Sequence, residues 1–426
     1  MINAHRRFAF YFNRQQSLFT HDCFRLWGVV LVITALIGPG VLAKDQADIE
    51  LDSYASKHYL IHSNLSKKEA RVFGKHMDRI FNAYKKRFQN LGLSVKNNAA
   101  MPLFLLRTQE QYATFMSQYQ INAVNTGGMF FVRHEIQGLA TFTQGRPATE
   151  TFDILQHEGF HQFAFKYLGA NLPIWVNEGL AQYFEDGIFV KGDLKLDLAN
   201  ARRIASIKTA IAEGRDIDFE QMLSMTDEQW SNTLAASPEQ ANLLYDQAWS
   251  MVFFLATAER GRYVEPFKRY LQAMASGTDS MQAFYESFRL TRVEPFHKAW
   301  QQYAREAQPD TVNIVLERLN FLGHALRYMK ERNMAMPLST AHLRSQLQKL
   351  QYRTLRTTHG ITTETSSQDE SLYRYPSGRA KRFFKILPPA GDDLPPGITA
   401  PGLKPRPTVI WSRDFDGQLM QDVVFH

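Results

Sequence analysis

HEGFH at residues 157–161 and IWVNEGLAQYFE at residues 174–185 are the stretches that decide the expected fold. Two histidines four positions apart on a helix lie on one face, one turn apart, where both imidazoles can reach one zinc ion. Glu158 lies between them and points beside the metal, where it can accept a proton from water. A further ligand must come from elsewhere, and Glu178, seventeen residues after the second histidine, is a carboxylate on a following helix.

We therefore expect His157, His161 and Glu178 to hold Zn²⁺ and to leave the fourth tetrahedral position open for water. Glu158 is the expected general base, and later general acid, of a metal-assisted peptide hydrolysis. HExxH alone could instead be a solvated helix face, because histidine and glutamate are ordinary surface residues. Three phenylalanines surround the motif: Phe160, Phe163 and Phe165. A polar stripe across an otherwise apolar helix favours the metal site.

Composition and charge limit the classes of protein to consider. The chain has 426 residues, of which 44% are hydrophobic and 13% aromatic, so we expect two or three modest domains with real cores. The formal net charge of +7 is mildly basic, and no dense basic face with interleaved aromatic residues points to nucleic acid. Cys23 is the single cysteine, which excludes a disulfide framework and a thiolate metal site from the chain that follows it.

Residues 1–43 read as an export signal. Four arginines against one aspartate make a positive segment, and Leu26 to Ile37 is an apolar run of twelve residues that ends at Gly38. Small residues at Ala43 and before it suit a cleavage site, although the charge-free stretch is also long enough for an uncleaved anchor. Either way we expect the body of the protein to be periplasmic or secreted, and to touch a membrane only if the segment remains as an anchor.

Hydrophobic periodicity predicts an α+β domain over residues 44–309. The expected order is strand, helix, strand, helix, hairpin, and then the two motif helices, followed by a mostly helical region. The predicted elements before the motif are a strand at 54–63, a helix at 66–89, a strand at 103–106, a helix at 108–116 and a hairpin of 129–132 with 138–142. From the motif onward, helices are predicted at 150–168, 176–186, 245–258, 264–275, 280–288 and 295–306.

The pattern changes after Pro309. Two leucine-rich stripes predict a helical hairpin at residues 310–360. Residues 361–426 begin with a polar stretch, and prolines recur from Pro388 to Pro407, which is typical of a flexible linker and an extended tail.

HEGFH with IWVNEGLAQYFE resembles the gluzincin zinc metallopeptidases. At the metal motif it is most similar to the zinc aminopeptidase pattern, HExxH followed by W-x-N-E-G-x-A-x-Y-x-E. The YxIxS stretch near residue 59 and the later YDQAWS run at 245–250 also resemble bacterial peptidase-MA-like domains of uncharacterised function. The resemblance covers about residues 54–305. It implies a thermolysin-like fold, a small mixed sheet beside a mostly helical second lobe, with the zinc ligands and base named above.

One departure from the aminopeptidases concerns substrate recognition. Those enzymes carry a Gly-x-Met-Glu-Asn motif whose glutamate grips the free amino terminus of the substrate. The nearest segment here is Gly127-Gly128-Met129-Phe130-Phe131, in which two phenylalanines replace the acidic and amide positions. We therefore expect an endopeptidase rather than an aminopeptidase.

Tyr245 is the candidate for a second electrophile that stabilises the transition-state oxyanion, because gluzincins place a tyrosine in this downstream region. The alternative is that its ring simply packs beside Trp249. Ligand histidines usually donate their other N–H to a carboxylate or carbonyl, and Glu185 or Asp153 could accept it here.

Two other histidines and one hairpin also require an interpretation. His134 and His297 lack ligand spacing, so we interpret them as surface or core residues. The hairpin from Gly128 to Phe142 precedes the metal helix, and an edge strand there could bind an extended peptide, although it could equally be a plain structural hairpin.

The sequence therefore predicts an exported zinc metallopeptidase with a peptide or protein substrate. One alternative is a catalytically silent protein that keeps the zinc scaffold to bind peptide or cell-envelope partners, against which the intact Glu158 argues. Another is a membrane-anchored envelope factor whose C-terminal hairpin and tail recruit a partner. The oligomeric state is left open.

Overall fold

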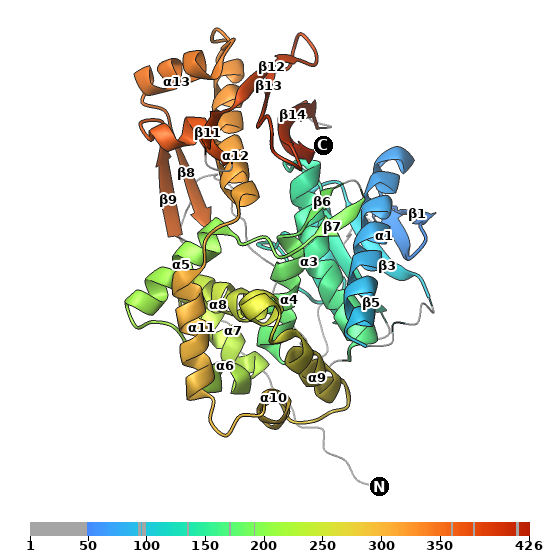
Figure 1. Cartoon of the computed structure of the whole chain (residues 1–426). Coiled ribbons are helices and arrows are strands. Elements are labelled where there is room, and N and C mark those ends of the chain that lie inside the picture. The colour runs from blue at the N-terminus through green and yellow to red at the C-terminus, as the bar shows by residue number, and fades with distance from the viewer. Residues whose placement is uncertain are drawn as a thin grey trace.

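The computed structural model describes residues 49–92, 95, 99–133, 136–169, 172–190, 192–358, 361–377, 380–414 and 417–426. The expected export signal at residues 1–43 lies outside the described residues. Within these ranges, no helix is both long and apolar enough to cross a membrane. Figure 1 shows three parts, which we call the sheet lobe (residues 49–169), the helical lobe (172–308) and the C-terminal lobe (310–426).

The sheet lobe contains a five-stranded sheet, counted over the described residues, in the order β1-β2-β3-β5-β4. Its strands are β1 (Asp52–Ala55), β2 (Tyr59–Ser63), β3 (Met101–Leu106), β4 (Gly128–Arg133) and β5 (Ile136–Phe142). Strands β2, β3 and β5 run parallel, whereas β1 and β4 are antiparallel to their neighbours. The sheet is therefore mixed, as expected, and β4 is one of its two edges.

The strand expected at 54–63 is instead two strands joined by a tight turn. Asp78 holds this turn, because its carboxylate accepts hydrogen bonds from the Ser56 hydroxyl and from the backbone N–H groups of Lys57 and His58. This contact comes from the helix that follows, so the local sequence pattern did not reveal it.

Alternation along the strands divides the sheet into two apolar faces. Leu103, Leu105 and Leu139 face α1 (Lys67–Asn90) and α3 (Ala148–Tyr167). Leu106 and Ala140 belong to the opposite face, which packs on α2 (Gln109–Ser117). Capping boxes start α1 and α2, with side chains of Ser66 and Thr108 as the caps.

The helical lobe follows α3 and begins with the second motif helix, α4 (Ile174–Glu185). A short hairpin, β6 (Ile188–Val190) and β7 (Asp193–Lys195), leads into the remaining helices. They are α5 (Ala201–Ala212), α6 (Phe219–Ser224), α7 (Asp227–Ala236), α8 (Pro238–Thr257), η1 (Ala258–Arg260), α9 (Val264–Ala275), α10 (Ser280–Phe288) and α11 (Glu294–Glu306). Helix α8 starts earlier than predicted, because Ser237 caps it and Pro238 suits its first position.

Helices α4 and α8 cross at a glycine. A Cβ added to Gly179 would lie 2.5 Å from the carbonyl oxygen of Ala248, so only glycine permits this approach. Gly179 follows Glu178 directly, and the close crossing therefore fixes the position of the Glu178 carboxylate relative to α8.

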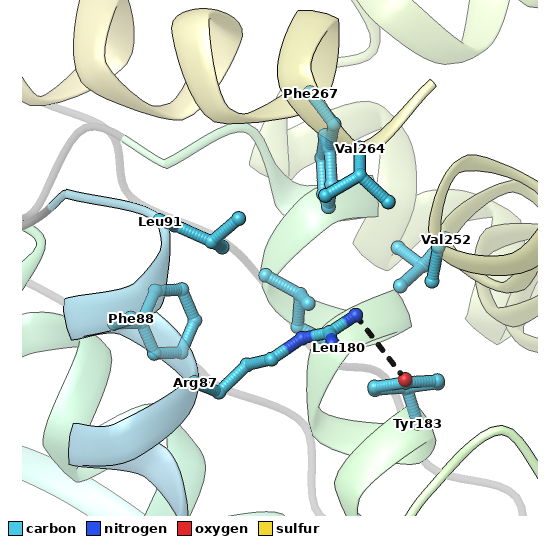
Figure 2. Close-up of a pocket in the computed structure, with 9 residues that line it drawn as sticks. Arg87, Phe88, Leu91, Leu180, Tyr183, Val252, Val264 and Phe267 are labelled. Carbon is cyan, nitrogen blue, oxygen red and sulfur yellow. Dashed lines mark hydrogen bonds between the residues drawn. The ribbon is translucent and has the colours of Figure 1, made fainter. Parts of the chain in front are cut away.

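Figure 2 shows a pocket at the junction of the sheet and helical lobes. Phe88 from α1 and Leu91, which caps the end of α1, face Leu180 from α4 and Val252 from α8 across it, with α9 on the far side. Arg87 donates a 3.4 Å hydrogen bond to the hydroxyl of Tyr183 at its rim. The lining is mostly apolar and belongs to one continuous core, so the two lobes pack as a single body.

The C-terminal lobe has its own core around α12 (Thr311–Glu331) and α13 (Thr340–Lys349), two helices within the range predicted for a helical hairpin. The expected linker and extended tail are wrong. Residues after 352 form β8 (Arg353–Thr358), β9 (Ile361–Ser366), η2 (Glu370–Tyr373), β10 (Arg374–Ser377), β11 (Ala380–Phe383), β12 (Lys385–Pro389), β13 (Pro396–Thr399), β14 (Pro407–Arg413) and β15 (Leu419–Phe425).

The recurring prolines predicted an extended tail, but they lie at positions where a β-sheet tolerates proline. Pro396 and Pro407 are the first residues of β13 and β14, and Pro389 is the last of β12, beside a register shift. Strands β12 to β15 form a sheet that buries Ile398 and Val409 against α12.

The C-terminal lobe touches the metal-motif helix directly. Asp422 on β15 accepts hydrogen bonds from the backbone N–H of Thr149, at 3.1 Å, and from its hydroxyl, at 2.7 Å. The preceding N-cap residue of α3 is Pro147, whose ring cannot accept a hydrogen bond. A carboxylate 273 residues away in sequence therefore caps the first turn of α3.

Candidate metal centre

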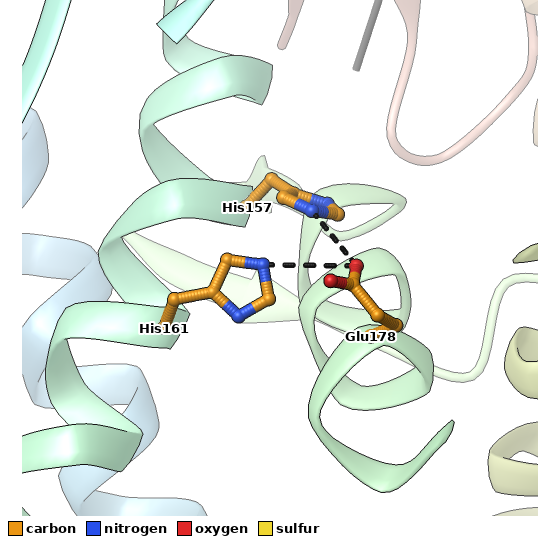
Figure 3. Close-up of side chains that lie close together, drawn as sticks. All are labelled: His157, His161 and Glu178. Carbon is orange, nitrogen blue, oxygen red and sulfur yellow. Dashed lines mark ion pairs between the residues drawn. The ribbon is translucent and has the colours of Figure 1, made fainter. Parts of the chain in front are cut away.

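His157 and His161 from α3 converge with Glu178 from α4, as Figure 3 shows. The Oε2 atom of Glu178 lies 3.5 Å from Nε2 of His157 and 3.7 Å from Nε2 of His161. Two ligands bound tetrahedrally at zinc distances lie roughly 3.3 Å apart, so these separations nearly match an occupied site. Each of the three residues is only 1% exposed.

The histidine rings are oriented by contacts on their other nitrogen atoms. Nδ1 of His157 lies 3.2 Å from Oε2 of Glu185, and Nδ1 of His161 lies 3.1 Å from Oδ1 of Asn177. Because both partners accept hydrogen bonds, they favour the tautomers whose Nε2 lone pairs face Glu178. Nε2 of His161 is buried without a hydrogen-bond partner in the described part of the chain. These residues could hold a metal ion.

Only one of the two residues that orient the histidine rings was predicted from the sequence. Glu185 was one of two acids expected to do so, and the other, Asp153, lies exposed on the second turn of α3. Asn177 was missed. Its position immediately before Glu178, on the helix that faces the histidines, was the available signal.

Glu158 lies buried between the histidines and the sheet. Its Oε2 accepts a 2.9 Å hydrogen bond from the backbone N–H of Phe130, on the edge strand β4. Burial raises the pKa of the Glu158 carboxyl to about 7, with the charges of Glu178 and Glu185 adding to the rise, although His157 and the Phe130 N–H act against it. A carboxyl with a pKa near 7 is suited to accept and return a proton at neutral pH.

The two imidazoles differ in their affinity for protons. Burial lowers the pKa of His161 to about 4, so this ring is neutral at pH 7. Burial also lowers the pKa of His157, but hydrogen bonds to Glu178 and Glu185 outweigh it and raise the pKa to about 10. Metal binding must therefore displace a proton from His157.

Tyr245 lies buried on α8 close to the same charges. Burial raises the pKa of its phenol, and the negative charges of Glu178 and Glu158 raise it further. Its ring packs edge-on against Trp230 of α7, with ring centroids 5.6 Å apart. The packing partner expected from the sequence, Trp249, stacks on Phe253.

The histidines read as non-ligands fall elsewhere. His297 is buried in the helical lobe, where its Nε2 lies 3.0 Å from Asp216 and its Nδ1 accepts the backbone N–H of Phe219. Those contacts join α11 to the start of α6, which is a structural role. His134 lies outside the described residues.

Part of the chain matches a known family. Residues 152–276 match a family described as a protein of unknown function (DUF1570). The matched segment contains the three converging residues, Glu158 and Tyr245, but it is less than half of the chain. No curated protein matches the chain. The chain is therefore similar, over its metal-motif region, to an uncharacterised family.

Proposed function

We propose that this protein is a zinc-dependent metallopeptidase of the gluzincin type, with a thermolysin-like catalytic domain, that hydrolyses peptide bonds. The observation that carries the proposal is the burial of His157, His161 and Glu178 around one point, with Glu158 beside them. The nitrogen and oxygen ligand set, without any thiolate, suits zinc in a catalytic site.

When bound, zinc supplies the Lewis acidity that activates water and polarises the peptide carbonyl. Glu158 accepts the proton from that water and later delivers it to the leaving amine. The Phe130 N–H holds Oε2 of Glu158, which leaves Oε1 as the atom that exchanges the proton. Tyr245 donates a hydrogen bond to the developing oxyanion, and its raised pKa keeps the phenol protonated for that role.

The edge strand β4 supports a substrate-binding role. Its Phe130 N–H points away from β5 and toward Glu158, so the free edge of the sheet faces the proposed catalytic base. An extended peptide paired along this edge would pass the metal centre. Phe130 packs on Phe165, and neither it nor Phe131 offers a carboxylate for a free amino terminus. We therefore propose cleavage within peptides.

The second candidate is a catalytically silent zinc scaffold that binds peptide or envelope partners. Such a protein has no use for a buried carboxyl held beside the metal ligands by a backbone N–H. The arginine-rich segment before Ala43 supports a periplasmic or secreted location for either candidate.

The test compares wild type with Glu158→Gln and with Glu110→Gln, which changes an exposed glutamate on α2 as a matched control. Zinc content is measured together with cleavage of a quenched peptide library whose members are N-acetylated. We expect Glu158→Gln to retain zinc and lose cleavage, while Glu110→Gln matches wild type. Failure of zinc-loaded wild type to cleave any library member would favour the silent scaffold.

A further inference from the structure

A buried arginine contacts a carboxylate that in turn contacts one of the proposed metal ligands. Arg203 on α5 is 3% exposed, and each of its guanidinium nitrogens faces a different acid. Nη2 lies 3.6 Å from Oε2 of Glu185, Nε lies 3.3 Å from Oδ2 of Asp186, and Nη1 lies 3.2 Å from Oδ1 of Asp246. Nη1 also donates a hydrogen bond to the side chain of Gln182.

Glu185 connects this arginine to the metal centre. The same Oε2 atom that faces Arg203 lies 3.2 Å from Nδ1 of His157. Displacement of the Glu185 carboxylate would therefore release the His157 ring, whose Nε2 faces Glu178. Because partners of ligand histidines tune metal affinity, the group that fixes Glu185 acts on the metal through it.

Asp246 connects the same arginine to the other side of the site. It follows Tyr245 directly on α8, whereas Glu185 and Asp186 end α4. Arg203 thus links the helix that carries Glu178 to the helix that carries the proposed oxyanion donor.

We propose that Arg203 is a positioning residue of the metal centre, which holds Glu185 against His157 and fixes α4 relative to α8. This inference rests on the proposed function, because it assumes that the three converging residues bind zinc. Only a planar guanidinium can direct three nitrogens at three separate carboxylates, and a lysine ammonium offers a single point charge. The chain therefore depends on arginine here and not merely on a positive charge.

Arg202 provides a matched control from the adjacent position. It makes two hydrogen bonds to Asp246, at 3.0 and 2.9 Å, and its side chain is 29% exposed. Its side chain joins the same cluster, but both of these hydrogen bonds go to Asp246 and not to Glu185. Arg202→Lys removes a similar number of hydrogen bonds without changing a contact to Glu185, the partner of His157.

The experiment measures the zinc dissociation constant of the full chain by competition with a chromogenic chelator. The variants are Arg203→Lys, Arg202→Lys, Glu185→Gln and the double variant Arg203→Lys with Glu185→Gln. Circular dichroism and thermal unfolding identify the temperature range in which each variant is folded. We expect Arg203→Lys to weaken zinc binding about tenfold and Arg202→Lys to leave it within about twofold of wild type.

The double variant is the decisive comparison. If Arg203 acts through Glu185, the double variant binds zinc no more weakly than Glu185→Gln alone. Additive losses would contradict the proposal, as would equal losses from the two arginine variants or a normal dissociation constant for Arg203→Lys. If Arg203→Lys does not fold, Asp246→Asn takes its place, because it removes the anchor of Arg203 on α8. We then expect affinity between those of wild type and Glu185→Gln, and unchanged affinity refutes the role.

The outcomes also separate this inference from the function on which it rests. A wild-type chain that binds no zinc overturns both. If the wild-type chain binds zinc and the arginine variants bind it equally tightly, only the role of Arg203 is overturned.

Discussion

Replacement of Gly179 by alanine tests whether the crossing of α4 and α8 sets the metal site. The added methyl group would lie 2.5 Å from the Ala248 carbonyl oxygen and 2.7 Å from a methyl carbon of Val252. Ordinary contact begins at 3.4 Å, so the two helices must separate by nearly an ångström. The closest atom belongs to a helix backbone, which cannot rotate away as a side chain can.

The expected cost follows from two opposing effects. Overpacking a buried site costs about 1–3 kcal/mol, and a clash with backbone belongs at the upper end. Alanine recovers up to about 1 kcal/mol through its higher helix propensity. We expect a net loss of about 2 kcal/mol in the free energy of unfolding. Zinc affinity should fall as well, because Glu178 precedes the displaced residue.

Gly159→Ala is the matched control, since Gly159 lies in the other motif helix beside Glu158. Its added methyl would first meet the terminal methyl of Met77 at 3.0 Å, a flexible side-chain end that can move. Urea unfolding and zinc competition are measured for both variants. We expect Gly159→Ala to unfold within about 1 kcal/mol of wild type. If Gly179→Ala proved as stable as wild type and bound zinc equally well, the close crossing would not position Glu178.

Three further predictions concern the cap, the protons and the metal. Asp422→Asn should lower the free energy of unfolding by about 1 kcal/mol in urea titrations, because it weakens the cap of α3; an equal effect from exposed Asp392→Asn would contradict this. Zinc affinity should rise about tenfold per pH unit from pH 6 to 8, because His157, with its pKa raised to about 10, must lose a proton on binding. Chelator competition at three pH values measures this slope, and an affinity that does not change with pH would contradict the prediction. Removal of zinc with a chelator should lower the thermal unfolding midpoint, and added zinc should restore it, unless the site binds no metal in the folded state.

The elements predicted best were those whose determinants are local. The apolar pattern of the motif helices, predicted at 150–168 and 176–186, lies within a few turns of chain, and the structure has helices α3 and α4 there. Glu185 was within reach for a different reason, because it lies on the second motif helix, 28 positions after its partner His157.

The elements that were missed depend on contacts between distant segments. Arg203 has no motif around it, and its contacts appear only when α5 packs against the C-terminal end of α4 and the middle of α8. The strands of the C-terminal lobe were read as a tail because proline frequency resembles disorder until Pro396 and Pro407 are seen at strand starts. Likewise, no sequence pattern near Thr149 predicts that Asp422 accepts its backbone hydrogen bond and caps α3.

That last contact has a consequence for the order in which the protein is made. Thr149 and Asp422 are separated by 273 positions, which a ribosome adds in on the order of tens of seconds. For that interval the helix that bears both histidines lacks its carboxylate cap. The helix that bears His157 and His161 therefore gains the hydrogen bonds that cap its first turn only after the C-terminal lobe has been synthesised and has docked.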